Sequence, residues 1–232
     1  NTAFNEASAS QKPLMIGTNA DEWTLFTALD ELEAGDLPDG EAAYSSLLGL
    51  VFSADVNSEI VNSVKLSYPL SDYSGDVSLA YSAIMTDSFF VCNSLNIANK
   101  ANDHSEVFMY EFSDKEAPNF FGIPASFDYG AAHAFEIPYL FAPNDKSLEE
   151  KLGMKQEQIA LANQMVSYWS NFAKIGSPNQ DSDLDFWPAY DSDFDGRNNM
   201  MRLSAASEAF PDIEYRDAHH CKSNSGIMTW AP

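Results

Sequence analysis

Short runs of apolar residues predict the buried strands of this chain. Lys12 to Thr18 is mostly apolar and is ended by Gly17 and Asn19, and Val107 to Phe112 is nearly all apolar and β-prone. Such runs, bounded by turn-forming residues, are typical of strands buried on both faces. Met200 to Leu203 is a third candidate, which we expect to be a last edge strand.

The region between the first two strands, residues 21 to 104, is mostly helical in pattern. Apolar residues recur at helical spacing in Ala54 to Lys65 and again in Asp87 to Ala98. The apolar positions of the two segments are Val56, Ile60, Val61 and Val64, and Phe90, Val91, Leu95 and Ala98. Pro69 to Gly75 breaks the pattern between them.

The clearest helix is predicted over Glu157 to Ile175. Its apolar stripe is Ile159, Ala162, Val166, Trp169 and Ala173, and its stop signals are Lys174, Gly176 and Pro178. Ser147-Leu148-Glu149-Glu150 resembles a capping box that starts a shorter helix before it. Strands separated by helical stretches predict a mostly parallel α/β sheet with flanking helices. There are no repeats and no dividing linker, so we expect residues 1–232 to belong to one domain.

The charge of the chain limits its partners. Its 232 residues carry 35 acidic and 12 basic side chains, a net charge of −23. Such a surface repels phosphate backbones and anionic membranes, which argues against nucleic-acid binding and membrane docking. It suits a salt-rich or extracellular setting, although solubility alone is an alternative reason for it. No apolar run approaches the roughly 20 residues that span a bilayer.

Two motifs carry the candidate chemistry. Gly17-Thr18-Asn19-Ala20-Asp21-Glu22 places carboxylates just after the first strand, and Gly130-Ala131-Ala132-His133 places a histidine in a loop of small residues. These are the acid and the base of a hydrolytic triad, in which the serine comes first along the chain within G-x-S-x-G. That pattern does not occur here, so we expect the nucleophile on a segment that ends before Asn1. Out of context, a single histidine is more often structural.

These residues resemble the C-terminal part of the type-B carboxylesterases, the family of the cholinesterases and the bacterial para-nitrobenzyl esterases. Four matching stretches occur in the order expected for that family. They are Pro13 to Asn19 with Asp21-Glu22, Gly130 to Phe141, Tyr168 to Asn179, and Trp187-Pro188-Ala189-Tyr190 followed by Met201 and Leu203. The resemblance implies the C-terminal portion of an α/β-hydrolase fold. One departure is Trp23, since the family usually has glycine after the glutamate.

The resemblance also implies roles for individual residues. His133 becomes the base and Glu22 the acid that orients it; adjacent Asp21 is the rival, because only one of the two can reach the histidine. An N-cap of the following helix suits Asp21. The resemblance places Leu25, Phe26 and Phe135 in the substrate pocket, with plain core packing as the alternative. Glu136 is expected to be a buried structural acid.

Two cysteines and two possible metal motifs complete the inventory. The resemblance pairs Cys92 with Cys221, which favours an exported, secreted or periplasmic protein over two buried thiols in a cytosolic one. Asp191-Ser192-Asp193-Phe194-Asp195-Gly196 opens like a calcium loop, but Arg202 stands where the bidentate glutamate belongs, so a solvated acidic turn is favoured. His219-His220-Cys221 has poor geometry for a tetrahedral metal, and the disulfide fits better.

These observations predict a carboxylic-ester hydrolase that acts through a serine acyl-enzyme. The chain would supply the acid and the histidine, with no cofactor. Its expected partners are a small-molecule ester and the N-terminal part of the same protein. The alternative is a cholinesterase-like binding or adhesion protein that has kept the fold and lost the serine.

Overall fold

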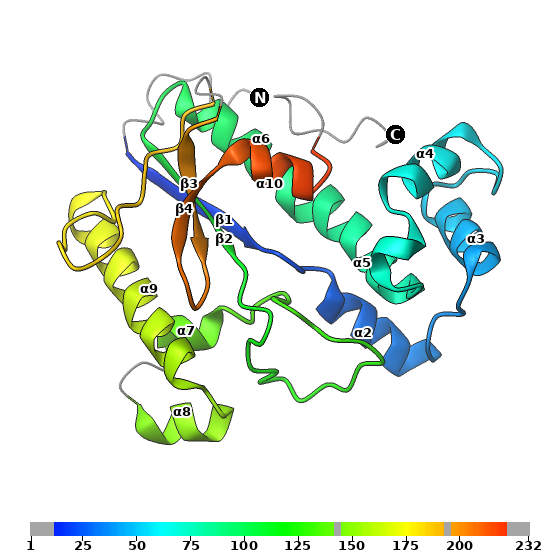
Figure 1. Ribbon diagram of the computed structural model, residues 1–232, viewed down its shortest axis with the longest axis horizontal. Coiled ribbons are helices and arrows are strands. Elements are labelled where there is room, and N and C mark those ends of the chain that lie inside the picture. The colour runs from blue at the N-terminus through cyan, green and yellow to red at the C-terminus, as the bar shows by residue number, and fades with distance from the viewer. Residues whose placement is uncertain (1–11, 142–144, 193–195, 222–232) are drawn as a thin grey trace.

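A four-stranded, mostly parallel sheet organises the chain (Figure 1). The computed structural model describes residues 12–141, 145–192 and 196–221. The strands are arranged in chain order, β1-β2-β3-β4. Their bounds are Leu14–Asn19, Val107–Phe112, Asn198–Leu203 and Glu208–Pro211. The first three are parallel and β4 is antiparallel to β3, which confirms the predicted α/β arrangement.

The last strand was not predicted. β3 contains Met200 to Leu203 but lies between β2 and β4, so its predicted place as an edge strand is wrong. β4, which forms the edge, has only four residues and ends in Pro211. Such a segment is too short for a readable alternation, and proline at its end fits an edge position.

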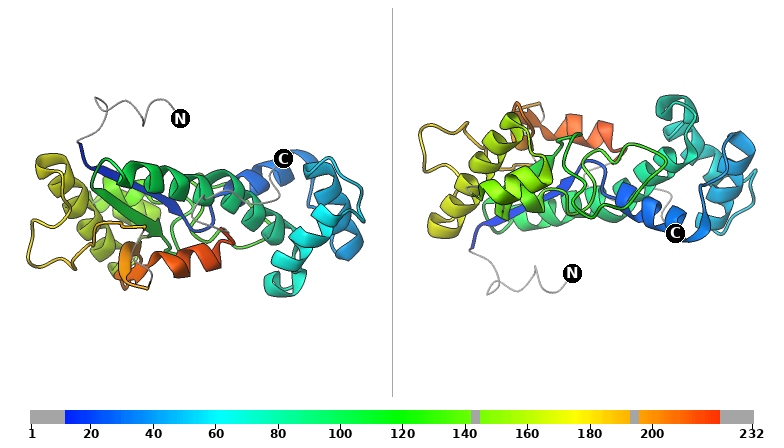
Figure 2. Two further views of the ribbon diagram at one scale, coloured as in Figure 1. Left: turned by 90° about the horizontal axis from the view of Figure 1, so that it is seen from above. Right: turned by 90° about the horizontal axis from the view of Figure 1, so that it is seen from below.

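The helices lie in the connections between the strands. Between β1 and β2 the chain forms α2 (Thr24–Ala34), α3 (Glu41–Val51), α4 (Glu59–Ser67), η1 (Leu70–Tyr73), α5 (Val77–Thr86), η2 (Asp87–Val91) and α6 (Cys92–Asn102). Between β2 and β3 it forms α7 (Ile137–Phe141), α8 (Lys146–Leu152) and α9 (Gln156–Ile175), and α10 (Asp212–Ala218) follows β4. Figure 2 shows the sheet toward one end of an elongated body and α3 and α4 toward the other.

Successive residues of the central strand point into two different cores. Val107 and Met109 of β2 pack with α5 and α6, in the same core as α3 and α4. Phe108 and Phe112 point the other way and pack with α7 and α9. Because both faces of β2 are covered, its sequence is an almost unbroken apolar run rather than an alternation.

Two predicted helices differ from the observed ones. Ala54 to Lys65 is replaced by α4, which begins after Ser58, whose hydroxyl caps the Val61 amide. Val56 therefore lies before the helix and is exposed, while Val61 and Val64 are fully buried. Asp87 to Ala98 is not a separate helix: it continues from α5 through a π-helical turn, η2, into α6.

The two predicted helices after β2 are present, but the buried face of α9 and the capping residue of α8 differ from the prediction. α9 agrees with the prediction for Glu157 to Ile175 within one residue. Its most buried apolar stripe is Leu161, Ala162, Met165 and Tyr168, about one position away from the predicted stripe, and Ala173 is exposed. α8 is capped by Asp145, which accepts from the Ser147 and Leu148 amides, so the proposed Ser147 cap is wrong. Among the described helices, none is both long and apolar enough to cross a bilayer.

A disulfide joins Cys92, the first residue of α6, to Cys221 beyond α10. The two cysteines are separated by 129 residues in sequence. The bond therefore ties the end of the described chain to the helix that covers β1 and β2.

Loss of this disulfide should destabilise the protein. Replacing both Cys92 and Cys221 with serine releases a long closed loop, so we expect the free energy of unfolding to fall by about 2–4 kcal/mol. Denaturant titration of the oxidised protein measures this change. The reduced wild type serves as the control and should match the variant; equal midpoints for the oxidised wild type and the double variant would contradict the expectation.

Candidate active site

Glu22 and His133 meet at the carboxyl end of β1. The Nδ1 atom of His133 lies 2.6 Å from Oε2 of Glu22, and the His133 amide donates to the Glu22 carbonyl at 3.3 Å. Glu22 is buried, whereas the His133 side chain is 43% exposed. Within the described residues, Nε2 of His133 has no hydrogen-bond partner. The ring is therefore held on one side and open on the other.

Asn19, the last residue of β1, holds both the acid and the histidine loop. Its amide donates to the second carboxylate oxygen of Glu22 at 2.8 Å. Its side-chain nitrogen donates to the Ala132 carbonyl at 2.7 Å and to Glu136 at 2.6 Å. Glu136 is thus a structural acid, but it is half-buried rather than buried as predicted. These bonds leave Oε2 of Glu22 facing His133.

Asp21 is neither the acid that faces His133 nor the N-cap of α2. Its carboxylate accepts from the Ala131 amide at 2.8 Å and forms an ion pair with Lys115 at 2.6 Å. It does not reach His133, and its side chain does not cap α2, so the predicted N-cap is wrong. Gly130 makes this contact possible: its φ is +60°, and a Cβ there would lie only 2.2 Å from Asp21 Oδ2. Asp21 fixes the loop and Glu22 faces the histidine.

An aromatic cluster lies against one side of the histidine. The rings of Phe26 and Phe90 lie 5.1 and 5.3 Å from the His133 ring. Trp23 packs on Phe26 at 4.8 Å and on Phe89 at 5.1 Å, and its amide donates to the Thr86 hydroxyl. The bulky residue in place of glycine therefore joins the start of α2 to η2 without displacing Glu22.

The other two residues expected in the pocket lie deeper. Leu25 and Phe135 are buried in the core between the sheet and α9, which is the packing alternative. Phe26 is half-buried beside His133. Of the three, only Phe26 has a ring that packs against the ring of His133.

The surroundings of His133 favour its charged form. The hydrogen bond that His133 donates to Glu22 raises the pKa of His133 above its ordinary value; partial burial opposes this, and the charges of Glu22 and Glu136 add to it. A carboxylate that stabilises the imidazolium makes the neutral ring a stronger base. The arrangement can accept a proton at Nε2 and return it.

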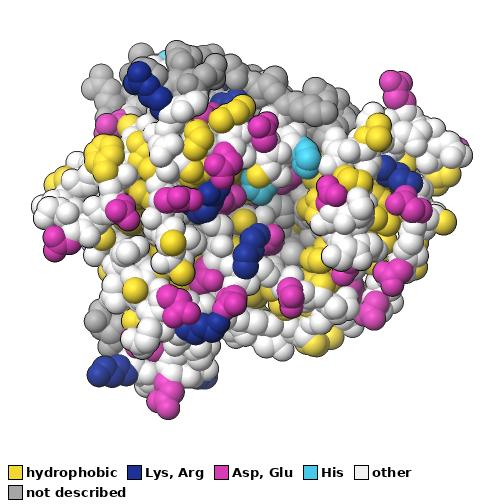
Figure 3. Space-filling model, in the orientation of Figure 1, with side chains coloured by type: hydrophobic (Ala, Val, Ile, Leu, Met, Phe, Trp, Pro, Cys, Tyr) yellow, Lys and Arg dark blue, Asp and Glu magenta, His cyan; other side chains and the backbone are white. Residues whose placement is uncertain are grey.

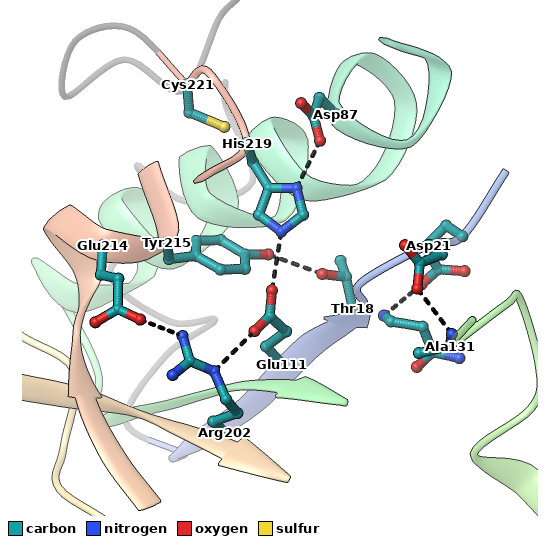
Figure 4. A network of polar contacts seen from close by, with 12 residues as sticks. Thr18, Asp21, Asp87, Glu111, Ala131, Arg202, Glu214, Tyr215, His219 and Cys221 are labelled. Atoms are coloured by element: carbon teal, nitrogen blue, oxygen red, sulfur yellow. Dashed lines mark hydrogen bonds and ion pairs between the residues drawn. The ribbon is translucent and has the colours of Figure 1, made fainter. Parts of the chain in front are cut away.

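A second histidine, His219, is held differently (Figure 4). Its Nδ1 lies 2.6 Å from Asp87 and its Nε2 2.9 Å from Glu111, so both ring nitrogens are occupied. It is also buried. A general base needs a free nitrogen that a substrate or nucleophile can reach. His219 lacks one, and its role is structural.

The two carboxylates keep His219 protonated. Burial alone would lower the pKa of His219, but Asp87 and Glu111 raise it to about 10. Burial alone would raise the pKa of Glu111, but His219 and Arg202 hold this pKa below its ordinary value. Arg202 also binds Glu208 and Glu214 at 3.1 and 2.7 Å. His219 is therefore a buried imidazolium within a larger charged network.

A cavity of about 620 Å³ opens over this network rather than over His133. Asp87, Glu111 and His219 contribute to its lining, and Figure 3 shows a hollow in this face with charged side chains of both signs around it. Across the described ranges, no three His, Cys, Asp or Glu residues are arranged to hold a metal ion. The possible calcium loop includes Asp193 and Asp195, which lie outside the described residues, so that alternative stays a prediction.

Comparison with known proteins identifies the family. The carboxylesterase family matches residues 1–219. The chain belongs to this family. It is 32% identical to mouse acylcarnitine hydrolase over 130 residues, which is 53% of this chain and 22% of that protein. It is 29% identical to the para-nitrobenzyl esterase of Bacillus subtilis strain 168 over 193 residues, 81% of this chain and 34% of that protein.

Solved structures agree on the fold. A thermophilic para-nitrobenzyl esterase has a TM-score of 0.58 at 24% identity, covering 93% of this chain and 40% of that one. Another para-nitrobenzyl esterase structure has a TM-score of 0.61 at 22% identity, covering 92% and 39%. The matches lie in the C-terminal parts of the carboxylesterases. The chain thus spans about a fifth to two fifths of the length of these relatives.

Several residues that build the site were not singled out from the sequence. Asn19 lies inside a recognised motif, and an amide side chain at the end of a strand beside two acids was the available signal. The apolar pattern places Phe90 only on a helix face, and Asp87 and Glu111 have no local signal in the sequence. Their roles depend on partners more than 100 residues away in the sequence, such as His219 for Asp87 and Glu111.

The Asp21 contact gives a test of the histidine loop. Gly130→Ala places a Cβ against Asp21 and should push Asp21 away from Ala131 and Lys115. We expect the left-handed φ to cost about 1–2 kcal/mol of unfolding free energy and the steric conflict a further 1–3 kcal/mol. Gly153→Ala is the matched control, because Gly153 has φ +67° with nothing within 4 Å. Equal losses in thermal or denaturant unfolding would show that the Asp21 contact is unimportant.

His219 should give the protein a pH-dependent stability. Its pKa in the folded protein is above its ordinary value, so its contribution is complete below about pH 6.5 and lost as the pH rises toward 10. We expect the wild type to lose stability over this range, relative to His219→Gln, with a slope of up to about 1.4 kcal/mol per pH unit. Denaturant titrations of both proteins at several pH values measure the difference; parallel curves would contradict a buried imidazolium.

Proposed function

We propose that the protein containing this chain is a carboxylic-ester hydrolase that acts through a serine acyl-enzyme. The observation that carries this proposal is the 2.6 Å contact of His133 Nδ1 with buried Glu22, with Nε2 left open. An acid on one ring nitrogen and an accessible second nitrogen are the geometry of a triad base. Membership in the carboxylesterase family supports the ester as the substrate class.

The proposed reaction has two acyl-transfer steps. His133 takes the proton of a serine hydroxyl at Nε2 while the serine oxygen attacks the ester carbonyl carbon. The tetrahedral intermediate collapses, the bond to the alcohol oxygen breaks, and His133 returns the proton to the departing alkoxide. Water then loses a proton to His133 and attacks the acyl carbon; as the bond from that carbon to the serine oxygen breaks, His133 gives the proton to the serine oxygen, which releases the carboxylic acid and restores the serine and the neutral histidine. Glu22 keeps its carboxylate throughout and stabilises the imidazolium.

The nucleophile and the oxyanion hole would come from the N-terminal part of the same protein. The chain has no G-x-S-x-G motif, and it spans only part of its relatives. Among the described strands, β1 pairs on one side alone, with β2. Its other edge carries backbone groups that can pair with a further strand. A strand added there would lie next to the end of β1, where Glu22 and His133 meet.

The aromatic residues beside His133 support an ester with an apolar group. Phe26 and Phe90 offer an apolar wall next to the base. Leu25 and Phe135, which are buried, would line the deeper part of the pocket. The relatives are named for different esters, an acylcarnitine and a para-nitrobenzyl ester among them, so the individual ester stays open.

We also propose that the protein is exported. The Cys92–Cys221 disulfide and the net charge of −23 support a secreted or periplasmic protein, because disulfides persist in oxidising compartments. A single α/β-hydrolase domain that includes the N-terminal part is the matching domain organisation. The second candidate function, a binding protein without the serine, would keep the fold and show no acyl transfer.

Removing the charge of Glu22 tests the proposal. In the full-length protein, Glu22→Gln should lower kcat by about 10⁴-fold, since an amide orients the wrong tautomer of His133 and does not stabilise the imidazolium. Hydrolysis of a chromogenic ester such as para-nitrophenyl acetate gives the rate. Glu33→Gln, an exposed change on α2, is the matched control and should leave kcat unchanged.

The pH profile of the same variants provides a second reading. Neutral His133 is the base, so kcat/KM should rise with pH through the pKa of His133. Glu22 raises that pKa, and the residual activity of Glu22→Gln should therefore rise at lower pH than that of the wild type. If the full-length wild type neither hydrolyses esters nor reacts with a fluorophosphonate probe, the binding protein becomes the better reading.

A further inference from the structure

The helical run from α5 to α6 contains a π-helical turn next to the candidate site. This turn, η2, comprises Asp87 to Val91 and inserts between two regular helices. π-turns are rare and are frequently found at functional sites. Asp87 at its start is buried, while Phe89 in its middle is 58% exposed. The turn thus begins with a buried carboxylate and exposes an aromatic ring at its centre.

The buried end is fixed by His219 (Figure 4). Asp87 accepts from His219 Nδ1 at 2.6 Å and from the Tyr68 hydroxyl at 2.7 Å. On its other side, His219 binds Glu111 of β2 at 2.9 Å. Two buried carboxylates on one side of a sheet repel each other unless a cation lies between them. The imidazolium of His219 is that cation, and it joins η2 to β2.

Other elements hold His219 in this place. The disulfide bonds Cys221, two residues further on, to Cys92, which directly follows η2. The ring of Tyr215 packs on the His219 ring at 4.9 Å, and its hydroxyl bonds Thr18 of β1 at 2.8 Å. Arg202 approaches Glu111 from β3 at 3.3 Å. The clamp formed by Asp87, His219 and Glu111 is therefore connected to strands β1, β2 and β3 and to helices α6 and α10.

The residues on either side of Asp87 contact the segment of the acid and the histidine. Thr86, the residue before Asp87, accepts the amide of Trp23, the neighbour of Glu22, at 2.9 Å. Phe90 lies 5.3 Å from the His133 ring and stacks with Phe26 at 6.2 Å. A shift of η2 would move both the segment that carries Glu22 and the ring that packs on His133.

We propose that His219 is a positioning residue for His133: by clamping Asp87 to Glu111 it fixes η2, which holds Phe90 against the His133 ring and keeps that ring aligned with Glu22. The inference rests on the proposed function for its kinetic readout but not for its structural one. His219 takes no part in proton transfer, since both of its nitrogens bind carboxylates.

The kinetic test compares three variants of the full-length protein. His219→Gln removes the charge of the clamp, Phe90→Leu removes the ring that packs on His133, and the third variant carries both changes. Titration with a fluorophosphonate counts competent sites, and the rate constant of labelling per titrated site is measured. We expect each single change to lower this rate constant about tenfold, because small misplacements of catalytic groups are costly. The double variant should be no slower than the slower single variant, since both changes act through one path.

A control separates positioning from stability. Tyr190→Phe removes both contacts of the Tyr190 hydroxyl, from Arg216 of α10 at 3.0 Å and to Asn99 of α6 at 2.6 Å, and it leaves Asp87 and η2 untouched. It should lower the unfolding temperature and leave the rate per site unchanged. If His219→Gln behaves in the same way, or if the two changes multiply in the double variant, the positioning role is overturned. Should His219→Gln not fold, Asp87→Asn keeps the shape, removes one charge of the clamp and takes its place.

The spectroscopic test does not require activity. The Nδ1 proton of His133, in a short hydrogen bond with Glu22, should give a downfield proton resonance that His133→Gln removes. We expect His219→Gln to shift or broaden this resonance and Tyr190→Phe to leave it in place. An unchanged resonance in His219→Gln would overturn the proposal. If wild-type protein shows this resonance but no labelling, the ester-hydrolase function fails and the resonance alone decides the positioning role.

Discussion

The parallel pairing of β1 with β2 is the constraint on which the candidate site depends. The register places Asn19 opposite Phe112, so both strands end at the same level, and the Ala20 amide donates to the Phe112 carbonyl at 2.9 Å. Glu22 follows β1 directly, and the loop after β2 returns with His133 to the same edge. A register shift of one residue would move Glu22 by about 3.3 Å, which is further than a hydrogen bond tolerates. The acid and the histidine meet because β1 and β2 end at the same edge of the sheet.

The sequence predicted the parts of the site that are local. An apolar run followed by Asn19, Asp21 and Glu22 marks a strand end, and a histidine among alanines marks an accessible loop, so the acid and the base were found as residue types. The sequence did not predict β4, η2 or the clamp around His219. Their existence depends on contacts made across the fold: β4 exists because β3 offers an edge, and His219 is charged because Asp87 and Glu111 surround it. The local spacing of residues does not predict which distant residues will be in contact.

The scarce cations of the chain are placed where carboxylates are most crowded. Only 12 lysines and arginines balance 35 acids. Lys115 lies on Asp21 beside the histidine loop, and Arg202 binds Glu111, Glu208 and Glu214 while covering the ring of Phe210 at 4.0 Å. His219 adds a further cation, between Asp87 and Glu111. The large negative charge is left to the surface, where water and salt screen it.

The disulfide also closes a covalent ring that includes His133 but not Glu22. The covalent ring closed by Cys92 and Cys221 contains β2, the whole histidine loop and β3, whereas Glu22 lies outside it on the arm that precedes Cys92. A single cut anywhere between the two cysteines would leave both pieces in one covalent molecule, with His133 still attached to the arm that holds its acid. A cut between Glu22 and Cys92 would leave only non-covalent contacts to keep acid and histidine together. The disulfide thus keeps Glu22 and His133 in one covalent molecule after a backbone cut between Cys92 and Cys221, but not after a cut between Glu22 and Cys92.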